Sequence, residues 1–331
     1  MRMIQATQFT GYQGLVQLDA PEPEVADGRV LVRVTAAGVT PLDHTILAGF
    51  HPRAKAPLVL GNEGAGVIED AGTSGLVPGS RVAFTGGYGV AENGSWEDFV
   101  TVRTDDLLPI PAGIDDVTAA SLPVAYLTAQ IALGEAGFAP GKTVLASAIG
   151  GSVGNATYQL AKARGAAVAI STAGSAAKAA QARDRGYADI IDLSAENIGD
   201  GVRRITAGRG VDVVIESLGG TFIGDGLRSL AVGGTLITVG YTAGRKADVD
   251  VTDLIWKRTR MAGFALLAQM PSVKRKAWEQ ITALITRGAV TPVIAQTFPL
   301  ERATEALRYL HEDRPFGKVV LAFQLPNDQP E

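Results

Sequence analysis

The order of apolar and polar residues divides the chain into two textures. Over roughly the first 120 residues, short apolar stretches alternate with polar positions and are broken by glycine and proline. Residues 29–39, RVLVRVTAAGV, alternate apolar and polar side chains, which predicts a half-buried strand. Further short strands are predicted at VLGNEGAGVIEDAG, PGSRVAF and GSWEDFVTV. Many short strands with frequent turns favour a compact, barrel-like all-β unit.

From about residue 125 onward, strand patterns and helix patterns alternate. The apolar strand patterns are TVLASAI, AAVAIST, ADIIDL, VDVVIES and GTLITVG. Helices are predicted from about Val153, over Ala176–Arg185, near Ile198–Ala207, near Phe222–Leu230, near Ser272–Arg287 and over Leu300–His311. Apolar strands separated by such helices indicate right-handed βαβ units and a parallel sheet. A last strand, GKVVLAF, follows the final helix.

A glycine turn lies between the first of these strands and its helix, within VLASAIGGSVGNATYQLAKARGA. With Gly154 in the last position of a G-x-G-x-x-G motif, Gly151 is the middle residue and Ile149 replaces the first glycine. The middle glycine lets the backbone approach a pyrophosphate, and the last lets the helix pack closely on the strand. The alternative is a glycine-rich turn without a ligand. The strand before it and the helix after it favour a dinucleotide site.

The next strand end bears on which dinucleotide is bound. An NAD site has an acidic residue about 20 residues after the turn, where it binds the ribose hydroxyls. This chain has AISTAGSAAK there, with no acid but with Ser171, Thr172, Gly174, Ser175 and Lys178. Because hydroxyls and a lysine bind a 2′-phosphate that a carboxylate would repel, we expect NADPH rather than NADH. The alternative for Lys178 is an ordinary solvated lysine on a helix.

Composition excludes several classes of protein. The 331 residues, 46% hydrophobic and 19% charged, suggest about two globular domains. The net charge of −4 gives no indication of nucleic-acid binding. The chain has no cysteine, so thiolate chemistry and Cys-ligated zinc are excluded, and His44, His51 and His311 are too scattered to suggest a metal site. The apolar stretch Val117–Leu133 is interrupted by polar residues, so we expect no membrane span, and the absence of cysteine fits the reducing cytosol, so we expect a cytoplasmic protein.

Several segments together resemble one family. The turn has the form Ala148-x-x-Gly151-x-x-Gly154 and is followed by QLAKARGA. The family's segments are also matched by GNEGAGVI and SLPVAYLTAQIAL before the turn and by ESLGG, GGTLITVG and FGKVVL after it. Over nearly its whole length the chain resembles the medium-chain dehydrogenase/reductase superfamily and, within it, the zinc-free quinone oxidoreductases (zeta-crystallin-like). In this family the threonine of the second segment, here Thr128, lies near the nicotinamide.

The resemblance implies an α/β fold of two domains. It implies a GroES-like β-barrel catalytic domain at 1–124 and a doubly wound, parallel Rossmann sheet that binds NADP(H) at 125–265. Residues 266–331 are expected to return to the catalytic domain. The resemblance also implies a homodimer, often formed through the edges of the Rossmann sheets.

Two positions indicate whether the chain has the zinc ligands of the alcohol dehydrogenases. Where zinc alcohol dehydrogenases have a cysteine and a histidine, this chain has Thr40 and Asn62, and the four-cysteine structural loop is missing too. We therefore expect no metal, and a substrate that accepts hydride easily, such as a quinone or an α,β-unsaturated carbonyl.

The chain also departs from the quinone oxidoreductase pattern. The asparagine, tyrosine and arginine of one loop are replaced by Thr40, Thr45 and Leu47, while its aspartate is kept as Asp43. A tyrosine that often helps to hold the 2′-phosphate is Leu193 here.

The candidate site residues form three groups. Asp43 and His44, in a loop after a strand, are candidates for substrate polarisation or proton delivery, together with Thr128. A loop-capping aspartate and an exposed histidine are the alternative. The substrate pocket is expected to include Thr40, Asn62, Tyr88 and Trp96, with core packing as the alternative for Trp96. The expected cofactor contacts are Thr128, Ile149, Gly150, Gly151, Ser152, Val153, Gly154, Ser171, Thr172, Gly174, Ser175, Lys178, Ser217, Leu218, Gly240, Tyr241, Phe264, Leu266 and Lys318.

Three functions remain open. The leading hypothesis is an NADPH-dependent, zinc-independent reductase that transfers hydride to a quinone, an activated alkene or a carbonyl. The second is an enoyl-thioester or ketone reductase of a biosynthetic pathway, which the altered residues Thr40, Thr45 and Leu47 favour slightly. The third is an NADPH-binding protein with little catalysis. The pocket loops do not identify the small-molecule substrate.

Overall fold

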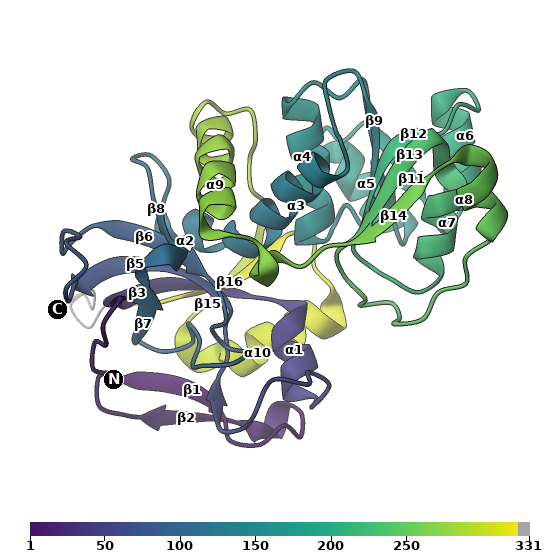
Figure 1. Cartoon of the computed structure of the whole chain (residues 1–331). Coiled ribbons are helices and arrows are strands. Elements are labelled where there is room, and N and C mark those ends of the chain that lie inside the picture. The colour runs from purple at the N-terminus through teal and green to yellow at the C-terminus, as the bar shows by residue number, and fades with distance from the viewer. Residues whose placement is uncertain (324–331) are drawn as a thin grey trace. The chain divides into compact units, whose positions relative to one another are not determined.

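The computed structural model describes residues 1–323, which form two compact units (Figure 1). Unit 1 comprises Met1–Val124 and the chain from Ile294 onward, and unit 2 comprises Ala125–Val293. The α/β fold class is confirmed. No helix within residues 1–323 combines the length and the apolar composition that crossing a bilayer requires.

Unit 1 is built on two β-sheets. The larger has seven strands in the order β15-β16-β3-β5-β6-β8, with β7 also paired to β3, and the smaller has the order β2-β1-β4. Their bounds are β1 Arg2–Ala6, β2 Leu15–Asp19, β3 Arg29–Val39, β4 Leu58–Val59, β5 Glu63–Asp70, β6 Arg81–Thr85, β7 Phe99–Arg103, β8 Leu107–Pro109, β15 Ile294–Phe298 and β16 Lys318–Ala322. The long strand β3 pairs antiparallel with β5, β7 and β16, so the last strand of the chain completes the first sheet.

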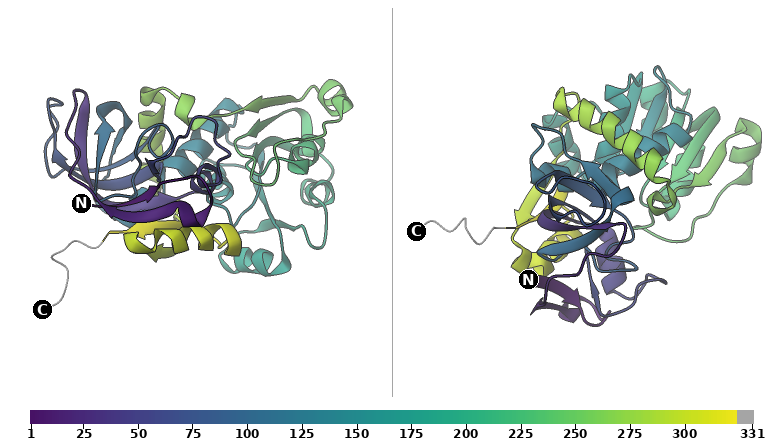
Figure 2. Two further views of the ribbon diagram at one scale, coloured as in Figure 1. Left: turned by 90° about the horizontal axis from the view of Figure 1, so that it is seen from below. Right: turned by 60° about the vertical axis from the view of Figure 1, so that its left-hand side comes forward.

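Segments far apart in the sequence meet in unit 1. Helix α10 (Ala303–Arg308) lies close to β1, which Figure 2 shows from below as yellow beside purple. The Arg2 guanidinium binds Asp98 at 2.8 Å and also pairs with Glu301, just before α10. Val30 of β3 and Leu307 of α10, both fully buried, belong to the same apolar core. This packing explains why the C-terminal segment groups with the N-terminal strands.

Helix α1 (Pro41–Leu47) occupies the segment that was expected to be a loop, so that expectation is wrong. Thr40 is the N-cap, Pro41 is in the first helical position, and Asp43 accepts the Thr40 backbone N–H at 2.7 Å. A capping box and an initial proline are strong helix-start signals. The helix is only seven residues long, too short for its apolar periodicity to be recognised.

Unit 2 contains a six-stranded parallel sheet in the order β11-β10-β9-β12-β13-β14. The strands are β9 Thr143–Ala146, β10 Val168–Ala173, β11 Asp189–Asp192, β12 Val211–Glu216, β13 Leu230–Thr238 and β14 Arg260–Gly263. The helices are α3 Pro123–Glu135, whose first two residues belong to unit 1, α4 Ser152–Ala163, α5 Ala176–Asp184, α6 Ile198–Thr206, α7 Thr221–Ser229, α8 Val251–Lys257 and α9 Pro271–Thr286. Numbered from β9, the order is 3-2-1-4-5-6, which is the Rossmann order with its switch point between β9 and β12.

The second boundary between the units differs from the one expected at residue 265. Residues 266–293 group with unit 2. Gln280 of α9 accepts a hydrogen bond from Gln130 of α3 at 2.6 Å, and the Gln159 side chain donates to the Thr291 carbonyl at 2.9 Å. These side-chain bonds hold the segment after the last parallel strand against α3 and α4, so the return to unit 1 begins only at Ile294.

Candidate functional site

The glycine turn between β9 and α4 is held by β10. The Ala148 backbone N–H donates to the Thr172 hydroxyl at 2.9 Å, and the Ile149 N–H donates to the Thr172 carbonyl at 2.8 Å. Ala148 has a left-handed φ of 60°, and its carbonyl accepts the Gly151 N–H at 2.9 Å. Ile149 is fully buried. The position of the missing first glycine is therefore used for packing.

The two remaining glycines of the motif are required for different reasons. A Cβ on Gly154 would overlap the carbonyl oxygens of Ser147 and Ala148, so only glycine allows α4 to approach β9 this closely. A Cβ on Gly151 would meet only Ala148, at 3.4 Å, which is ordinary contact, and Gly151 has a regular φ of −83°. Gly151 is also exposed. Nothing within unit 2 demands a glycine there, which matches a position that a ligand approaches closely.

The N-terminus of α4 provides the donors of this site. The helix begins at Ser152, with Gly151 as N-cap, and no side chain among the described residues caps it. Gly150, Ser152 and Val153 are half-buried around this helix start. Unpaired N–H groups and the positive end of the helix dipole attract a phosphate. The residues present therefore fit a pyrophosphate.

Two of the hydroxyls expected at the 2′-phosphate have structural partners instead. Ser171 is fully buried in β10 and donates to the Ala146 carbonyl at 2.6 Å. Thr172 is 1% exposed and accepts the Ala148 N–H. Both side chains come before the end of β10 and fasten it to β9 and the glycine turn. These hydrogen bonds give both hydroxyls a structural role, and their contact with the cofactor stays a prediction.

The other members of that group lie where β10 ends. Gly174 is exposed, and Ser175 is the N-cap of α5, where its hydroxyl accepts the Lys178 backbone N–H at 3.3 Å. Lys178 is half-buried in the first turn of α5. Leu193, in the place of the family's tyrosine, packs against the apolar core of unit 2. Gly174, Ser175 and Lys178 thus remain together as candidates for binding a 2′-phosphate.

Further candidates lie at the ends of β12 and β13. The Ser217 N–H donates to the Ser147 hydroxyl at 2.8 Å, which joins the end of β12 to the end of β9. Gly240 packs against the Ser217 carbonyl so closely that a Cβ would overlap it. Tyr241 is 46% exposed, and the Arg245 guanidinium lies 5.6 Å from its ring centre. Ser217 and Gly240 are therefore neighbours at the switch point of the sheet.

The remaining candidates of unit 2 are more dispersed. The Phe264 N–H donates to the Thr238 carbonyl at 2.9 Å, and Leu266 begins a short 3₁₀ helix after β14. Leu218 directly follows Ser217 in the turn after β12. Thr128 lies in α3 and is 6% exposed.

A second polar group lies in unit 1, around the start of α1. Asp43 is fully buried and accepts hydrogen bonds from the Thr40 N–H and hydroxyl, both at 2.7 Å, and from the Gly61 N–H at 3.0 Å. The Thr40 hydroxyl also lies 3.4 Å from the Asn62 side-chain oxygen. Burial raises the pKa of Asp43 to about 6, although these hydrogen bonds act to lower it. The structure thus brings Thr40, Asp43 and Asn62 together.

Lys318, an expected cofactor contact, has a different partner. Its ammonium group forms an ion pair with Glu63, and the side chains are 5% and 0% exposed. The other Glu63 oxygen accepts the Val124 N–H, at the start of α3, at 2.7 Å. Gly38 makes room for this carboxylate, because a Cβ there would overlap it. Lys318 therefore balances a buried charge within unit 1.

The histidines do not form a metal centre. The His44 ring stacks on the His311 ring, with centroids 3.5 Å apart and planes 13° apart. Burial and the neighbouring His311 lower the pKa of His44. Residues 1–323 hold no group of three or more His, Asp or Glu placed to bind a metal ion.

Tyr88 and Trp96, expected in the substrate pocket, are core residues of unit 1. Both are fully buried within one apolar cluster. The Tyr88 hydroxyl donates to Asp106 at 3.1 Å and accepts the Arg103 N–H at 2.9 Å. The Trp96 indole donates to the Gly38 carbonyl at 3.3 Å. Both polar atoms are satisfied internally, which is how buried Tyr and Trp are usually accommodated.

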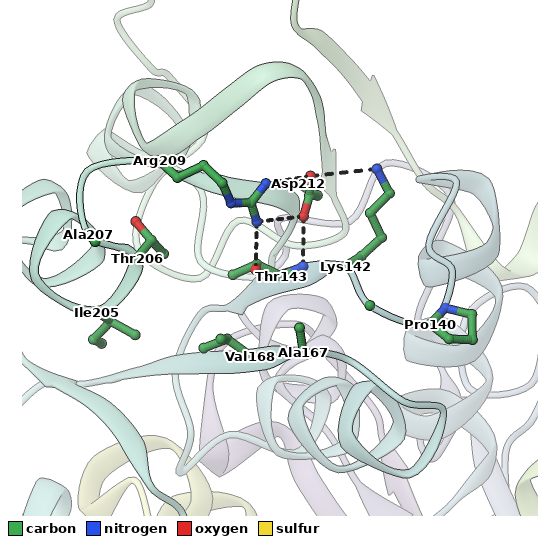
Figure 3. A pocket seen from close by; sticks show the side chains of 11 residues that line it. Pro140, Lys142, Thr143, Ala167, Val168, Ile205, Thr206, Ala207, Arg209 and Asp212 are labelled. Carbon is green, nitrogen blue, oxygen red and sulfur yellow. Dashed lines mark hydrogen bonds and ion pairs between the residues drawn. The ribbon is translucent and has the colours of Figure 1, made fainter.

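A cavity of about 640 Å³ lies at the amino ends of β9, β10 and β12, opposite to the ends that carry the glycine turn (Figure 3). Its floor carries one carboxylate, Asp212, which accepts the Thr143 N–H at 2.8 Å and an Arg209 N–H at 2.9 Å. Lys142 lies 3.6 Å from the same carboxylate. The hydrogen-bonding groups of this cavity thus join the beginnings of β9 and β12, whereas the glycine turn lies at the carboxyl ends.

Sequence reasoning missed Glu63 and Glu216. Glu216 ends the apolar strand β12, and its two oxygens accept the N–H groups of Leu218 and Gly219. Glu63 is the one charge in GNEGAGVI, and Glu216 follows three apolar residues at the end of VDVVIES, which also contains Asp212. Because a buried charge must be paired or hydrogen-bonded, such an isolated charge was the available signal.

Comparisons with known proteins identify related families. A family model described as the alcohol dehydrogenase GroES-like domain matches residues 26–112, and one described as zinc-binding dehydrogenase matches 185–321. Quinone oxidoreductase of Rattus norvegicus is 30% identical over 328 residues, which cover 97% of each chain. A phenolphthiocerol synthesis polyketide synthase of Mycobacterium marinum is 34% identical over 316 residues, covering 91% of this chain and 14% of that protein. The solved structure of mycobacterial Rv1454c complexed with NADPH has a TM-score of 0.86 at 28% identity, covering 97% of this chain and 100% of that one.

A GroES-like unit combined with a Rossmann unit that carries a glycine turn defines an oxidoreductase enzyme. More particularly, the chain belongs to the medium-chain dehydrogenase/reductase superfamily, with quinone oxidoreductases among its relatives. Such oxidoreductases act on small molecules.

Proposed function

We propose that this protein is an NADPH-dependent, zinc-independent reductase that transfers hydride to a quinone or to an activated alkene or carbonyl. The observation that carries the proposal is the exposed Gly151 at the uncapped start of α4, where nothing among residues 1–323 requires a glycine. The complex of the mycobacterial relative with NADPH and the quinone oxidoreductase relatives support the cofactor and the substrate class.

The residues of unit 2 would bind and orient the cofactor. The α4 N-terminus would bind the pyrophosphate, and Gly174, Ser175 and Lys178 would bind the 2′-phosphate through a hydroxyl and an ammonium group. Thr128 would lie near the nicotinamide, as the resemblance implies. When bound, NADPH supplies the hydride, so the protein needs to supply orientation and the exclusion of competing reactions.

The residues of unit 1 would orient the substrate. Asp43 fixes the Thr40 hydroxyl through a 2.7 Å hydrogen bond, and that hydroxyl lies next to the Asn62 side chain. We propose that Thr40 and Asn62 face the substrate and that Asp43 positions Thr40. His44, stacked on His311, is the weaker candidate for proton delivery.

Zinc independence rests on the chemistry of the donor set. A hydroxyl and an amide, Thr40 and Asn62, stand where zinc enzymes have a thiolate and an imidazole, and neither is a usual zinc ligand. A substrate that accepts hydride without a Lewis acid fits these residues better than an alcohol or a simple ketone.

The direct test is the oxidation of NADPH at 340 nm with a panel of quinones and then a panel of enones. We expect turnover with at least one of these two classes and weaker activity with NADH. Binding of NADPH without turnover on any member of either panel would contradict the proposal and would favour a cofactor-binding protein with little catalysis.

A second candidate is an enoyl-thioester or ketone reductase of a biosynthetic pathway. The 34% identity with part of a polyketide synthase favours it, as do Thr45 and Leu47 in place of the tyrosine and arginine of quinone reductases. Acyl-CoA enoyl thioesters offered beside the quinones decide between the two, because the second candidate predicts the higher kcat/KM for the thioester.

We also propose a homodimer formed through β14. This strand is the last of its sheet, and all four of its residues are exposed. Apolar side chains of the neighbouring α8 are exposed too, Ile255 to 66% and Trp256 to 78%. An exposed sheet edge with apolar side chains invites pairing with a second copy. Light scattering should give twice the chain mass, and Trp256→Glu should shift the equilibrium toward monomer; a monomeric wild type would contradict the dimer.

A further inference from the structure

Glu216 ends β12 at the switch point of the parallel sheet. Its neighbour Ile215 pairs with Ala146 of β9, immediately before the glycine turn. Glu216 is 1% exposed, so its carboxylate is removed from water. A carboxylate in such a place is costly unless hydrogen bonds replace its hydration.

The two carboxylate oxygens of Glu216 bind two different backbone groups. One accepts the Leu218 N–H and the other the Gly219 N–H, both at 2.7 Å. Gly219 and Gly220, the next residues, have left-handed φ values of 73° and 60°. The carboxylate therefore closes a sharp turn in which both donors point back at the side chain that precedes them.

The turn at residues 217–220 also holds the loop that follows β13. The Leu218 carbonyl accepts the Ala243 N–H at 2.7 Å, and the Gly220 N–H donates to the Gly244 carbonyl at 3.0 Å. A Cβ on Gly240 would overlap the Ser217 carbonyl, so the loop lies directly against the turn. Residues 217–220 and 240–244 thus form one hydrogen-bonded assembly.

The same assembly is tied to the glycine turn. The Ser217 N–H donates to the Ser147 hydroxyl at 2.8 Å, and the two serine hydroxyls lie 3.1 Å apart. Ser147 immediately precedes Ala148, the left-handed residue that starts the glycine turn. One carboxylate therefore organises backbone at the carboxyl ends of three neighbouring strands, β9, β12 and β13.

We propose that Glu216 is a positioning residue, which fixes the Ser217–Gly220 turn and the Gly240–Gly244 loop in the geometry that receives the dinucleotide. It acts through the backbone and does not itself touch the cofactor. The inference rests on the proposed function, because it assumes that a nicotinamide dinucleotide binds at this edge of the sheet. Glutamine cannot replace Glu216, since its amide NH₂ would face one of the two N–H donors that the carboxylate accepts.

Asp212 provides a matched control at the other end of the same strand. It also accepts a backbone N–H, from Thr143 at 2.8 Å, and it joins β12 to β9. It lies in the cavity at the amino ends of the strands (Figure 3), away from the glycine turn. Asp212→Asn should therefore lower the stability of the protein without changing the backbone at the carboxyl ends of the strands.

The test compares wild type, Glu216→Gln and Asp212→Asn in two measurements. NADPH affinity is measured by fluorescence titration, and hydrogen exchange of the cofactor-free proteins is followed in peptides covering 217–220 and 240–244. We expect Glu216→Gln to weaken NADPH binding at least tenfold and to speed exchange in both peptides. We expect Asp212→Asn to bind NADPH within twofold of wild type, with both peptides unchanged.

Each other outcome has a definite meaning. Glu216→Gln with wild-type affinity and exchange, or equal loss of affinity in both variants, would overturn the inference. If wild type does not bind NADPH, the proposed function fails, while the exchange data still decide whether Glu216 holds the two segments. If Glu216→Gln does not fold, Glu216→Asp replaces it: its shorter side chain should give intermediate affinity and exchange, and wild-type behaviour in both would overturn the inference.

Discussion

The two units place their polar groups in different ways. Unit 2 uses backbone: its glycine turn, helix N-terminus and strand ends present N–H and C=O groups that neighbouring strands hold in position. Unit 1 uses buried side chains, Asp43 of α1 and Glu63 of β5, both 0% exposed. A site built from backbone groups tolerates most side-chain substitutions, but it tolerates few substitutions of a glycine that the backbone geometry requires. A buried charge instead depends on the particular residue that pairs with it.

The largest expected effect concerns the buried ion pair of unit 1. Lys318→Met leaves the Glu63 carboxylate without its counter-ion, and breaking a buried pair in this way costs roughly 3–5 kcal/mol of stability. Urea denaturation measures the loss. The double variant Glu63→Gln, Lys318→Met should recover part of it, because no uncompensated charge remains. A loss in the single variant below about 1 kcal/mol would show that Glu63 does not depend on Lys318 as its counter-ion.

An effect of similar size depends on pH and concerns Glu97 of unit 1. Its Oε2 has no hydrogen-bond partner among residues 1–323, and burial, followed by the nearby Asp98, raises its pKa from 4.5 to about 8. A raised pKa favours folding below the unfolded value of 4.5, and this stability is lost as pH rises through about 8. The loss is on the order of 5 kcal/mol.

Glu97→Gln, which mimics the protonated acid, should remove this dependence. Urea denaturation at pH 5 and pH 9 should show a smaller decline for the variant than for wild type. Glu22→Gln is the control, because Glu22 is exposed in the same unit. Parallel pH profiles for wild type and Glu97→Gln would contradict the prediction.

The next effect separates the two glycines of the turn in unit 2. Gly154→Ala places a Cβ against the Ser147 and Ala148 carbonyl oxygens and should cost about 1–3 kcal/mol of stability. Gly151→Ala meets only ordinary contact, so its stability should stay within about 0.5 kcal/mol, while the KM for NADPH rises about tenfold. Thermal melting and steady-state kinetics test both. A stable Gly154→Ala or an unstable Gly151→Ala would contradict the division of roles.

The smallest effect concerns cofactor choice. Lys178→Ala should raise the KM for NADPH about tenfold, the equivalent of one charge-assisted hydrogen bond, and leave the KM for NADH unchanged. Lys162→Ala is the matched control, an exposed lysine on α4. Equal changes with both cofactors would remove Lys178 from the proposed 2′-phosphate site.

The contrast between the two units also explains which features could be predicted from the sequence. The Rossmann strands and the helices around them could be predicted because their apolar periods are local. The glycine turn could be predicted because Gly151 and Gly154 are three residues apart, and their different requirements follow from backbone geometry. The short helix α1 could have been recognised from its capping box, Thr40 with Asp43, but not from periodicity.

Partner choice between distant residues could not be predicted. Lys318 pairs with Glu63 across 255 positions, and no pattern in either segment points to the other. Ser171 and Thr172 fit a cofactor site by residue type alone, but Ser171 donates to the Ala146 carbonyl of β9 and Thr172 accepts the Ala148 N–H of the glycine turn. Tyr88 and Trp96 show the same limit: an aromatic residue in a glycine-rich segment fits a pocket and a core equally well until its burial is known.

The most direct test of the proposed chemistry is NADPH oxidation at 340 nm by the best substrate of the quinone and enone panels, after exhaustive dialysis against a zinc chelator. We predict that turnover with NADPH is unchanged by the dialysis and by added zinc, and that it exceeds turnover with NADH at equal concentration. Loss of activity on dialysis with recovery on adding zinc, or equal rates with the two cofactors, would contradict the account.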